Sequence, residues 1–463
     1  MIFTFYYLIV YLLLDMNKCN ASKNVAIIGA GAAGLISAKL FIENGFDVCI
    51  YEKSDRIGGV WNCDLNGPMY GSIKTNLPVE VMEINEGFPF PSKEDTSYFG
   101  HKEVLNYLDI FAKKNNLNKI TRLSHEVYSI DYLNSKWHIE FNCNNCIKTE
   151  THDYVVVCNG HYNTPYSPTY EGIVNFKGKI FHSKDYCKFN LNEFIDKSIL
   201  VIGARSSAND IARELAHVCK NVYISDRNLE KGPIGYGNIQ HCTSFSHISG
   251  DGSFVFSDGF VMKGIDILFY CTGYVYDYPF MKTSNQIDLN HFTAQENEIN
   301  QGNLDQLIID KGRAVLNLYQ HVFLNENPTL AFVGIPWAIA PFHLFYLQAL
   351  WIINVFLNKS SLPSLVDRNQ WIVNHIYQLK ETGAYPDKFH YLGDKQWNYL
   401  RYLSSEAGIF DRKQDLYINM NEEIYNDNKL SAPKYPGADD TYRSRKYIVD
   451  RESGTWDVSN FSN

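Results

Sequence analysis

The order of apolar and polar residues predicts short buried strands that are each followed by a turn and a helix. Val25–Ile28 is an apolar run, and a helix-like run from Leu35 to Glu43 follows it. A second short strand covers Asp47–Tyr51. Strands that alternate with helices form parallel sheets, so the pattern predicts an α/β fold.

The same pattern recurs in the middle of the chain. Ser198–Ile202 reads as a strand, Asn209–Val218 as a helix and Asn221–Ser225 as a second strand. Further expected elements are an amphipathic helix at Lys102–Asn115, β structure at Glu126–Glu140 and Cys146–Cys158, a hairpin across Phe254–Met262, a strand at Asp266–Cys271, and a strand, turn and helix within Leu330–Trp351. Residues beyond about 360 are polar and Tyr-rich, with weak helical periodicity.

A glycine motif occupies the first strand-to-helix turn. Gly29-x-Gly31-x-x-Gly34 provides a tight turn, a close backbone approach to a pyrophosphate and close packing of helix on strand. The helix N-terminus offers free N–H groups to phosphate. Glu52, eighteen residues after Gly34, is placed to bind a ribose hydroxyl. These features predict a dinucleotide site; the alternative is a glycine-rich turn of an unrelated α/β domain.

Length and composition indicate a globular chain of two or three structural units. It has 463 residues, 45% of them apolar. A net charge of −9 and a pI of about 5.9 give no basic surface for nucleic acid. Among ten cysteines, Cys143 and Cys146 flank an Asn-Asn turn; we expect a structural thiol pair, as a disulfide if the protein is secreted, rather than a metal site.

The N-terminal segment resembles a cleaved signal peptide over residues 1–21. Ile2–Leu14 is a 13-residue apolar run, short for a membrane span. Small residues follow at Cys19–Ala21. The expectation is secretion without a transmembrane anchor; if translation starts at Met16, the protein is cytoplasmic.

A second nucleotide site is predicted at Gly203-Ala-Arg-Ser-Ser-Ala208. Two nucleotide folds in one chain imply two nucleotides. Arg227, just beyond the second strand of this unit, suits a 2′-phosphate because its planar fork binds phosphate well. This points to NADPH, with a surface arginine as the alternative reading.

Between the two units lies Phe176-Lys-Gly178-Lys-Ile-Phe-His182-Ser-Lys-Asp-Tyr186. By itself it would be read as a structural linker. In this context it resembles the F-x-G-x-x-x-H-x-x-x-[YF] fingerprint of flavin-containing monooxygenases. The other motifs in that family's order are Gly29-x-Gly31-x-x-Gly34, Gly58-Gly59-x-Trp61, Thr75-Asn76, Phe88-Pro-Phe-Pro91, Asn159-Gly160-His161 and Cys271-Thr-Gly-Tyr274.

The resemblance covers roughly residues 24 to 351. The loop Thr75–Met82 and the apolar N-terminus look most like the insect branch, which includes secreted pyrrolizidine-alkaloid N-oxygenases.

The resemblance implies two Rossmann-like domains. The FAD-binding domain would cover 24–170 and 326–463, and an NADPH-binding domain over 171–325 would be inserted in it. FAD would be held by Gly29, Gly31, Gly34, Glu52 and Trp61, and NADPH by Gly203, Ser206, Ser207 and Arg227. Further cofactor-binding residues would be Ala32, Ala33, Lys53, Gly59, Val60, Thr75, Thr272, Gly273 and Gln348.

The reaction that the resemblance implies needs O2 and a small nucleophilic substrate, and no metal ligands. NADPH reduces FAD, a C4a-hydroperoxyflavin forms, and one oxygen atom passes to a soft nitrogen or sulfur, as in alkaloid detoxification. Asn76 would bind NADP+ and protect the oxygenated flavin, since an amide both donates and accepts; an Asn that caps a loop is the alternative. A homo-oligomer is left open.

Two departures from the family pattern matter. Arg205 stands at the second glycine position of the NADPH motif, and Ala208 at the third. Either the loop tilts or the Arg205 guanidinium joins phosphate binding. Near Gln348, Tyr346 and Leu350 replace the acidic and basic residues that the family often has.

Three rival functions remain. Baeyer–Villiger monooxygenases share the layout but end the fingerprint with Trp, where this chain has Tyr186. Disulfide reductases of related build need a redox cysteine pair beside the flavin. A secreted flavoprotein in which Arg205 impairs NADPH use would act as a binding protein.

Overall fold

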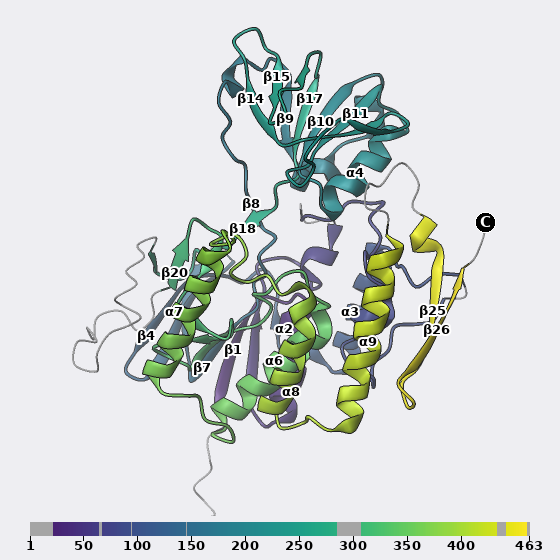
Figure 1. Ribbon diagram of the computed structural model, residues 1–463. Coiled ribbons are helices and arrows are strands. Elements are labelled where there is room, and N and C mark those ends of the chain that lie inside the picture. Colours follow the sequence, from purple (N-terminus) through teal and green to yellow (C-terminus); the bar gives the residue numbers. More distant parts are fainter. Residues whose placement is uncertain are drawn as a thin grey trace, which may run out of the picture.

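The chain folds into two units that a narrow connection joins (Figure 1). The computed structural model describes residues 22–63, 67–93, 95–144, 146–284, 307–432 and 441–460. The expected signal peptide, residues 1–21, lies outside the described residues. Among the described helices, none combines the length and the apolar composition that a membrane crossing requires.

The larger unit is built on a seven-stranded sheet in the order β22-β23-β24-β7-β1-β2-β3. Its strands are β1 (Asn24–Ile28), β2 (Asp47–Tyr51), β3 (Thr121–Arg122), β7 (Tyr154–Val157), β22 (Leu318–Tyr319), β23 (Phe323–Leu324) and β24 (Leu330–Phe332). The strand β1 pairs in parallel with β2 and β7. Its central position places the turn after β1 between two neighbouring strand ends.

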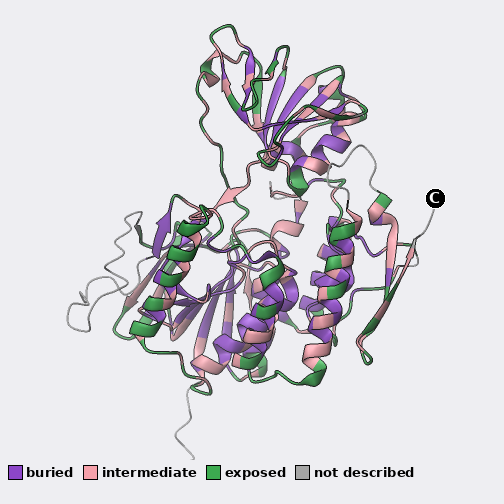
Figure 2. Cartoon of the chain, in the orientation of Figure 1, coloured by how far each residue is buried: buried purple, intermediate pink, exposed green. Residues whose placement is uncertain are grey.

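The two faces of this sheet are covered differently. Val25, Ile27 and Ile50 pack under helices on one face, and Ala26 and Ile28 pack on the other. The helices are α2 (Ala32–Glu43), α3 (His101–Lys114), α6 (Pro341–Phe356), α8 (Gln396–Glu406) and α9 (Arg412–Ser431). The second face carries an antiparallel sheet of β4 (Glu126–Leu133), β5 (Lys136–Cys143) and β6 (Cys146–His152). Figure 2 shows burial concentrated on the strands and on one side of each helix.

The smaller unit repeats this plan, with strand order β12-β13-β11-β10-β17-β9. Its strands are β9 (Lys179–His182), β10 (Ser198–Ile202), β11 (Asn221–Ser225), β12 (Ile234–Tyr236), β13 (Ile239–Cys242) and β17 (Ile267–Tyr270). The helix α4 (Ser206–Ala216) packs on one face. The other face carries β14 (Phe245–Ile248), β15 (Phe254–Phe256) and β16 (Val261–Met262). Each glycine loop therefore follows a buried central strand, as the apolar pattern predicts.

The connection between the units contains a short antiparallel pair, β8 (Thr164–Pro165) and β18 (Tyr274–Val275). After β18 the chain is back in the larger unit: Leu307, Ile309 and Val315 pack with the core of the large sheet. These residues belong to β20 (Leu307–Asp310) and β21 (Ala314–Val315), which form a small sheet with β19 (Thr283–Ser284). The expected inserted domain, 171–325, is therefore too long at its C-terminal end, because these short strands carry no periodic signal.

The C-terminal region contains α7 (Leu365–Glu381) and, after α8 and α9, a hairpin of β25 (Arg445–Asp450) and β26 (Thr455–Asn460). The weak helical periodicity beyond residue 360 is confirmed for the three helices, and the hairpin is an addition. Glu126–Glu140 is two strands rather than one run, because Asn134 and Ser135 turn the chain with positive φ angles of 52° and 62°.

The turn between β5 and β6 is confirmed, with Cys143 opposite Cys146. Both thiols are free, Cys143 buried and Cys146 exposed. The structure therefore contains no disulfide at this hairpin.

Candidate active site

The first glycine loop packs closely against neighbouring backbone at the end of β1. Gly29 has a φ of +104°, and a Cβ there would lie 2.6 Å from the Cys158 carbonyl oxygen. A Cβ on Gly34 would overlap the Gly29 carbonyl oxygen. A Cβ on Gly31, by contrast, would meet Gly59 Cα at an ordinary contact distance of 3.6 Å. Gly31 is therefore the glycine of this motif that the packing of the protein does not itself require.

The second glycine pair packs against the first glycine loop. The Gly58 N–H donates to the Ala30 carbonyl oxygen at 2.9 Å. Gly58 and Gly59 both have positive φ, and Gly59 begins the short 3₁₀ helix Gly59–Trp61. The two backbones thus pass so closely that a Cβ on Gly59 would lie 2.9 Å from Gly31 Cα.

Glu52 is buried directly after β2, where an acid is expected beside a ribose. Its Oε2 accepts from the Ala30 N–H at 2.7 Å, and its Oε1 accepts from the Ser54 N–H at 2.9 Å. The carboxylate therefore ties the first glycine loop to the turn after β2. Each oxygen keeps a second lone pair with which it can accept a hydroxyl.

The remaining residues predicted around the first nucleotide lie at the same edge of the sheet. Ala32 and Ala33 form the first turn of α2. Lys53 is exposed beside Glu52, whereas Val60 and Trp61 are half-buried. The Trp61 ring packs edge-on against Phe342 at 6.5 Å. The structure thus brings these predicted residues together at one edge of the sheet.

Asn76 connects the two units. Its side-chain Nδ2 donates to Ser206 Oγ at 3.2 Å, across the gap between the larger unit and α4. Its carbonyl oxygen accepts from Asn428 Nδ2 on α9 at 3.1 Å. Thr75 is buried and holds the loop to Phe99. Its N–H donates to the Phe99 carbonyl oxygen, and its hydroxyl oxygen accepts from the Phe99 N–H. Asn76 is thereby presented at the mouth of the second glycine loop.

The second glycine loop has the form that the strand-to-helix pattern predicts. Gly203 has a φ of +116°, and a Cβ there would collide with the Cys271 carbonyl oxygen. Ser206 and Ser207 are the first residues of α4 and are exposed, so their N–H groups point toward the gap. Arg205 caps the helix in an ordinary extended conformation, φ −94°. The loop therefore accepts an arginine without backbone strain.

Arg205 turns its side chain toward the larger unit. The guanidinium lies over the Trp337 ring, 4.4 Å from the ring centre. Loss of water around the guanidinium lowers the pKa of Arg205, and the nearby charges of Arg227 and Arg313 lower it further. Of the two outcomes expected for Arg205, a tilt of the loop is therefore not needed, and a part of the guanidinium in phosphate binding stays a prediction.

Thr272 and Gly273 lie where β17 returns to the connection between the units. The Thr272 hydroxyl donates to the Tyr166 carbonyl oxygen, and the Tyr166 N–H donates to the Gly273 carbonyl oxygen at 2.9 Å. His182 Nε2 donates to the same Gly273 oxygen at 3.1 Å. The fingerprint histidine and the Thr-Gly pair thus fix the connection.

Gln348 is placed differently from the expectation. Its side chain is fully buried in α6, with Oε1 accepting from the Gly334 N–H at 3.0 Å and Nε2 donating to Tyr399 Oη at 3.2 Å. With no exposed surface, it cannot touch a cofactor. It supports the Gly334 loop, which follows β24 beside the first nucleotide site.

His161 lies at the same edge of the large sheet, just after β7. Burial lowers the pKa of its imidazole to about 4. The ring is therefore neutral at neutral pH, and it packs 5.3 Å from the ring of Tyr276.

A cavity of about 240 Å³ opens beside Asn76. It lies between α4 and α9 and includes Ser206, Asn209, Tyr425 and Tyr442 in its wall. The contact of Asn76 with Ser206 therefore lies in the wall of this cavity.

Three comparisons with known proteins agree with this geometry. The family model described as flavin-binding monooxygenase-like matches residues 22–231 and 229–457. The flavin-containing monooxygenase FMO GS-OX-like 2 of Arabidopsis thaliana is 32% identical over 421 residues, covering 83% of this chain and 85% of the relative. The structure of S-allyl-L-cysteine S-oxygenase from Allium sativum is 31% identical, with a TM-score of 0.77 over 91% of this chain and 95% of that one.

The chain belongs to the flavin-binding monooxygenase-like family. It is thus an NADPH-dependent flavoprotein monooxygenase that uses FAD. A cyclohexanone monooxygenase from Rhodococcus sp. Phi1, 14% identical with a TM-score of 0.58 over 83% of this chain, shares the fold.

The residues of this flavin-binding monooxygenase fit a dinucleotide at the first loop. The packing of the protein does not require a glycine at position 31, and a ligand whose pyrophosphate approaches this backbone closely would account for it. The free N–H groups of the first turn of α2 would bind its phosphates. FAD bound there and reduced by NADPH would supply the chemistry of O2 activation. The chain would position the reactants and exclude water from them.

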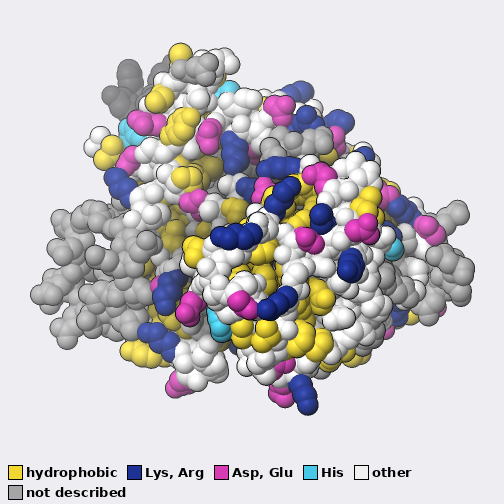
Figure 3. All heavy atoms as spheres, turned by 90° about the horizontal axis from the view of Figure 1, so that it is seen from above, with side chains coloured by type: hydrophobic (Ala, Val, Ile, Leu, Met, Phe, Trp, Pro, Cys, Tyr) yellow, Lys and Arg dark blue, Asp and Glu magenta, His cyan; other side chains and the backbone are white. Residues whose placement is uncertain are grey.

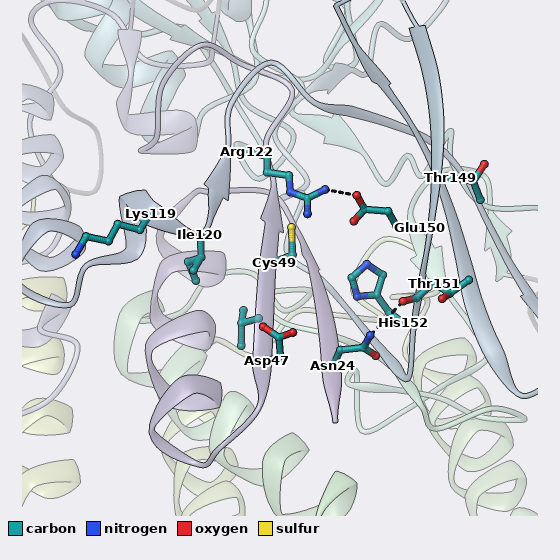
Figure 4. Close-up of a pocket in the computed structure, with 11 residues that line it drawn as sticks. Asn24, Asp47, Cys49, Lys119, Ile120, Arg122, Thr149, Glu150, Thr151 and His152 are labelled. Carbon is teal, nitrogen blue, oxygen red and sulfur yellow. Dashed lines mark hydrogen bonds and ion pairs between the residues drawn. The ribbon is translucent and has the colours of Figure 1, made fainter. Parts of the chain in front are cut away.

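A second hollow, of about 620 Å³, runs along β2 (Figure 4). Asn24 and Asp47, the first residues of β1 and β2, line one end of it, and Arg122 pairs with Glu150 across it at 2.6 Å. Arg122 is paired with Tyr51, the last residue of β2, so the hollow extends along the strand toward Glu52.

The sequence motifs of the family did not reveal three residues that line the gap between the units. Trp337 and Asp387 come from loops of the larger unit, and Arg313 follows the turn after β20. None of them belongs to a recognisable spacing, so no local signal could have found them. Over the face seen in Figure 3, basic and acidic side chains are interspersed.

Proposed function

We propose that the protein transfers one oxygen atom from O2 to a soft nucleophilic nitrogen or sulfur of a small molecule, with FAD at the first glycine loop and NADPH at the second. The observation that carries the proposal is the contact between Asn76 Nδ2 and Ser206 Oγ, at 3.2 Å. It puts an amide of the FAD unit at the N-terminus of the NADPH-unit helix, where the two cofactors would meet.

The chain contributes binding, orientation and exclusion of water. The glycine loops and helix N-termini hold two pyrophosphates. Arg227, exposed just after β11, is placed for the 2′-phosphate of NADPH. The Asn76 amide can donate to one cofactor and accept from the other. A dry gap matters because water diverts the oxygen from the substrate.

The substrate reaches this gap through the cavity beside Asn76. Its wall contains tyrosines and asparagines, and Arg213, Lys429 and Arg443 beside a single acid, Asp210. Such a lining suits an uncharged or zwitterionic molecule better than a cation. The similarity to the S-allyl-L-cysteine S-oxygenase from Allium sativum supports a sulfur nucleophile. A pyrrolizidine alkaloid is the nitrogen nucleophile that we propose as an alternative substrate. Detoxification by a secreted enzyme is the wider role that we propose for the protein.

The test replaces the amide that joins the units. Asn76→Ala should still oxidise NADPH, but should release most of the oxygen as hydrogen peroxide rather than as product, because the reactive oxygen is no longer shielded. NADPH consumption, peroxide and product are measured together for a panel of thioethers, tertiary amines and alkaloids. Product falling by roughly tenfold or more relative to NADPH is the expected result.

Asn142→Ala is the matched control, since it removes a side-chain amide of β5 that donates to Tyr128 Oη at 3.4 Å and has no part in cofactor binding. It should keep most of the coupling. Unchanged coupling in Asn76→Ala would contradict the role of the amide. A yellow protein that never oxidises NADPH would contradict the proposed function and favour a binding protein.

A further inference from the structure

Three arginines from three separate segments gather at the outer end of the gap between the units. Arg205 precedes α4, Arg227 follows β11, and Arg313 follows the turn after β20. Arg227 and Arg313 both lower the pKa of the Arg205 guanidinium, as expected for positive charges close enough to repel one another. Such a grouping is unfavourable unless an anion lies among them.

One carboxylate contacts two of these arginines. Asp387, in the segment after α7, lies with Oδ2 3.8 Å from Arg227 Nη1 and with Oδ1 3.2 Å from Arg313 Nε. The acid next to Arg227 in the chain, Asp226, instead accepts from the Asn228 N–H at 2.8 Å within its own turn. The three positive charges of the arginines are therefore accompanied by the single negative charge of Asp387.

The contact of Asp387 with Arg227 is long and exposed, whereas its contact with Arg313 is shorter. The Arg227 side chain is 63% exposed and that of Arg313 only 21%. Arg313 is also held by the Tyr274 carbonyl oxygen and lies over the Tyr166 ring. Arg313 thus fixes Asp387 to the larger unit, and Asp387 in turn reaches Arg227 on the smaller one.

We propose that Asp387 competes with the 2′-phosphate of NADPH for Arg227 and thereby limits the preference of the enzyme for NADPH over NADH. This inference rests on the proposed role of Arg227. A phosphate at Arg227 gains from the guanidinium but meets the Asp387 carboxylate a few ångströms away, and like charges at that distance repel. A non-phosphorylated ribose meets no such repulsion.

Arg205 strengthens the site without competing for Asp387. Its guanidinium is engaged with the Trp337 ring, and Trp337 packs against Tyr391 at 4.7 Å. It adds positive charge that a phosphate can feel. The arginine that replaces the usual glycine is therefore a partner of the same anion site rather than an obstacle to NADPH.

The experiment measures binding to the FAD-loaded protein by calorimetry, without turnover. The probes are adenosine 2′,5′-bisphosphate, which carries the 2′-phosphate, and 5′-AMP, which lacks it. Asp387→Asn should tighten binding of the bisphosphate roughly twofold to fivefold and leave 5′-AMP unchanged, because one exposed charge contact is worth about that factor. The gain should shrink in high salt.

Arg227→Ala separates this inference from the proposed function. It should weaken the bisphosphate roughly tenfold or more and leave 5′-AMP unchanged. If it weakens neither probe, Arg227 does not bind the phosphate, and the proposal about Asp387 falls with it. If it weakens the bisphosphate but Asp387→Asn leaves that affinity unchanged or lowers it, Asp387 is no competitor and the inference is overturned.

Two controls complete the design. Asp251→Asn removes a carboxylate from another exposed ion pair, with Lys263 at 2.8 Å, on the smaller unit that carries Arg227. It should change neither affinity. Asp387→Ser tests whether any gain comes from loss of the charge rather than from the asparagine amide, and it should give the same direction as Asp387→Asn. Opposite directions in the two Asp387 variants would overturn the proposal.

Discussion

At the scale of single residues, the glycines of the first loop serve two different purposes. A Cβ on Gly34 would overlap the Gly29 carbonyl oxygen, so Gly34 is required by the packing of α2 on β1. Gly31 has a φ of −75°, which any residue adopts, and its Cβ position lies at an ordinary contact distance from Gly59. Gly31 is therefore required by the ligand rather than by the protein.

Alanine at the two positions should give different defects. Gly31→Ala should change the free energy of unfolding of the flavin-free protein by less than about 1 kcal/mol, yet the purified protein should lose its yellow colour. Gly34→Ala should cost about 3 kcal/mol even without flavin, because backbone must move. Urea unfolding followed by circular dichroism and the flavin absorbance of purified protein measure these effects. A Gly31→Ala protein with full flavin would refute the distinction.

At the scale of elements, a buried histidine on α6 joins three segments. His343 Nδ1 donates to the Ile84 carbonyl oxygen at 3.1 Å, and its Nε2 accepts from Gln414 Nε2 on α9 at 2.9 Å. Burial lowers the pKa of His343 from 6.5 to about 4. Both ring nitrogens are used in the neutral form, so a second proton has no acceptor.

The folded protein should therefore lose stability on acidification. Below pH 6.5 the unfolded chain takes up a proton on His343, whereas the folded chain excludes it until about pH 4. The stabilisation is complete above pH 6.5, and roughly 3 kcal/mol of it should be lost between pH 6.5 and 4. His343→Gln should flatten this part of the curve of unfolding free energy against pH. His247→Gln, on β14 of the smaller unit, is the control and should leave the slope unchanged.

The elements that sequence reasoning predicted are those with a local signal. The strands β1 and β10 are continuous apolar runs that end in glycine turns, and both lie where they were predicted. The strand β22 has two residues and no periodicity. The hairpin of β25 and β26 is largely polar and is fixed by partners in the first quarter of the chain. Pairing with distant residues decides such elements, and no window of sequence contains it.

At the scale of the whole molecule, the site is composed by the docking of two units. The motifs predicted the glycines, Glu52 and Asn76, because each belongs to a spacing. They could not predict that Arg205 reaches Trp337 or that Asp387 reaches Arg227, because those contacts join loops of different units. Gln348 was misjudged for the same reason: its role depends on Tyr399, a residue of another helix.

The C-terminal hairpin closes the larger unit over two buried acids from its N-terminal part. Glu80 and Glu83 are 6% and 1% exposed. Lys446 Nζ lies 3.4 Å from Glu80 Oε1, and Arg451 Nε lies 3.0 Å from Glu83 Oε2. Burial raises the pKa of Glu83 to about 7, against the opposing effect of Arg451. The cations that β25 and the following turn carry thus oppose the rise in the pKa of these carboxylates that burial causes.

Arg451→Met should destabilise the protein by about 3 kcal/mol at pH 8, because it leaves a buried carboxylate without its cation. The loss should be smaller at pH 6, where an unpaired Glu83, with its raised pKa, takes up a proton and becomes neutral. Glu83→Gln in the Arg451→Met background should restore most of the stability, since the buried charge is then gone. Lys413→Met, which removes an exposed partner of Glu86, is the control and should cost less than about 1 kcal/mol. Urea unfolding at the two pH values measures all four proteins, and a double variant no more stable than Arg451→Met would show that the hairpin holds by packing rather than by charge.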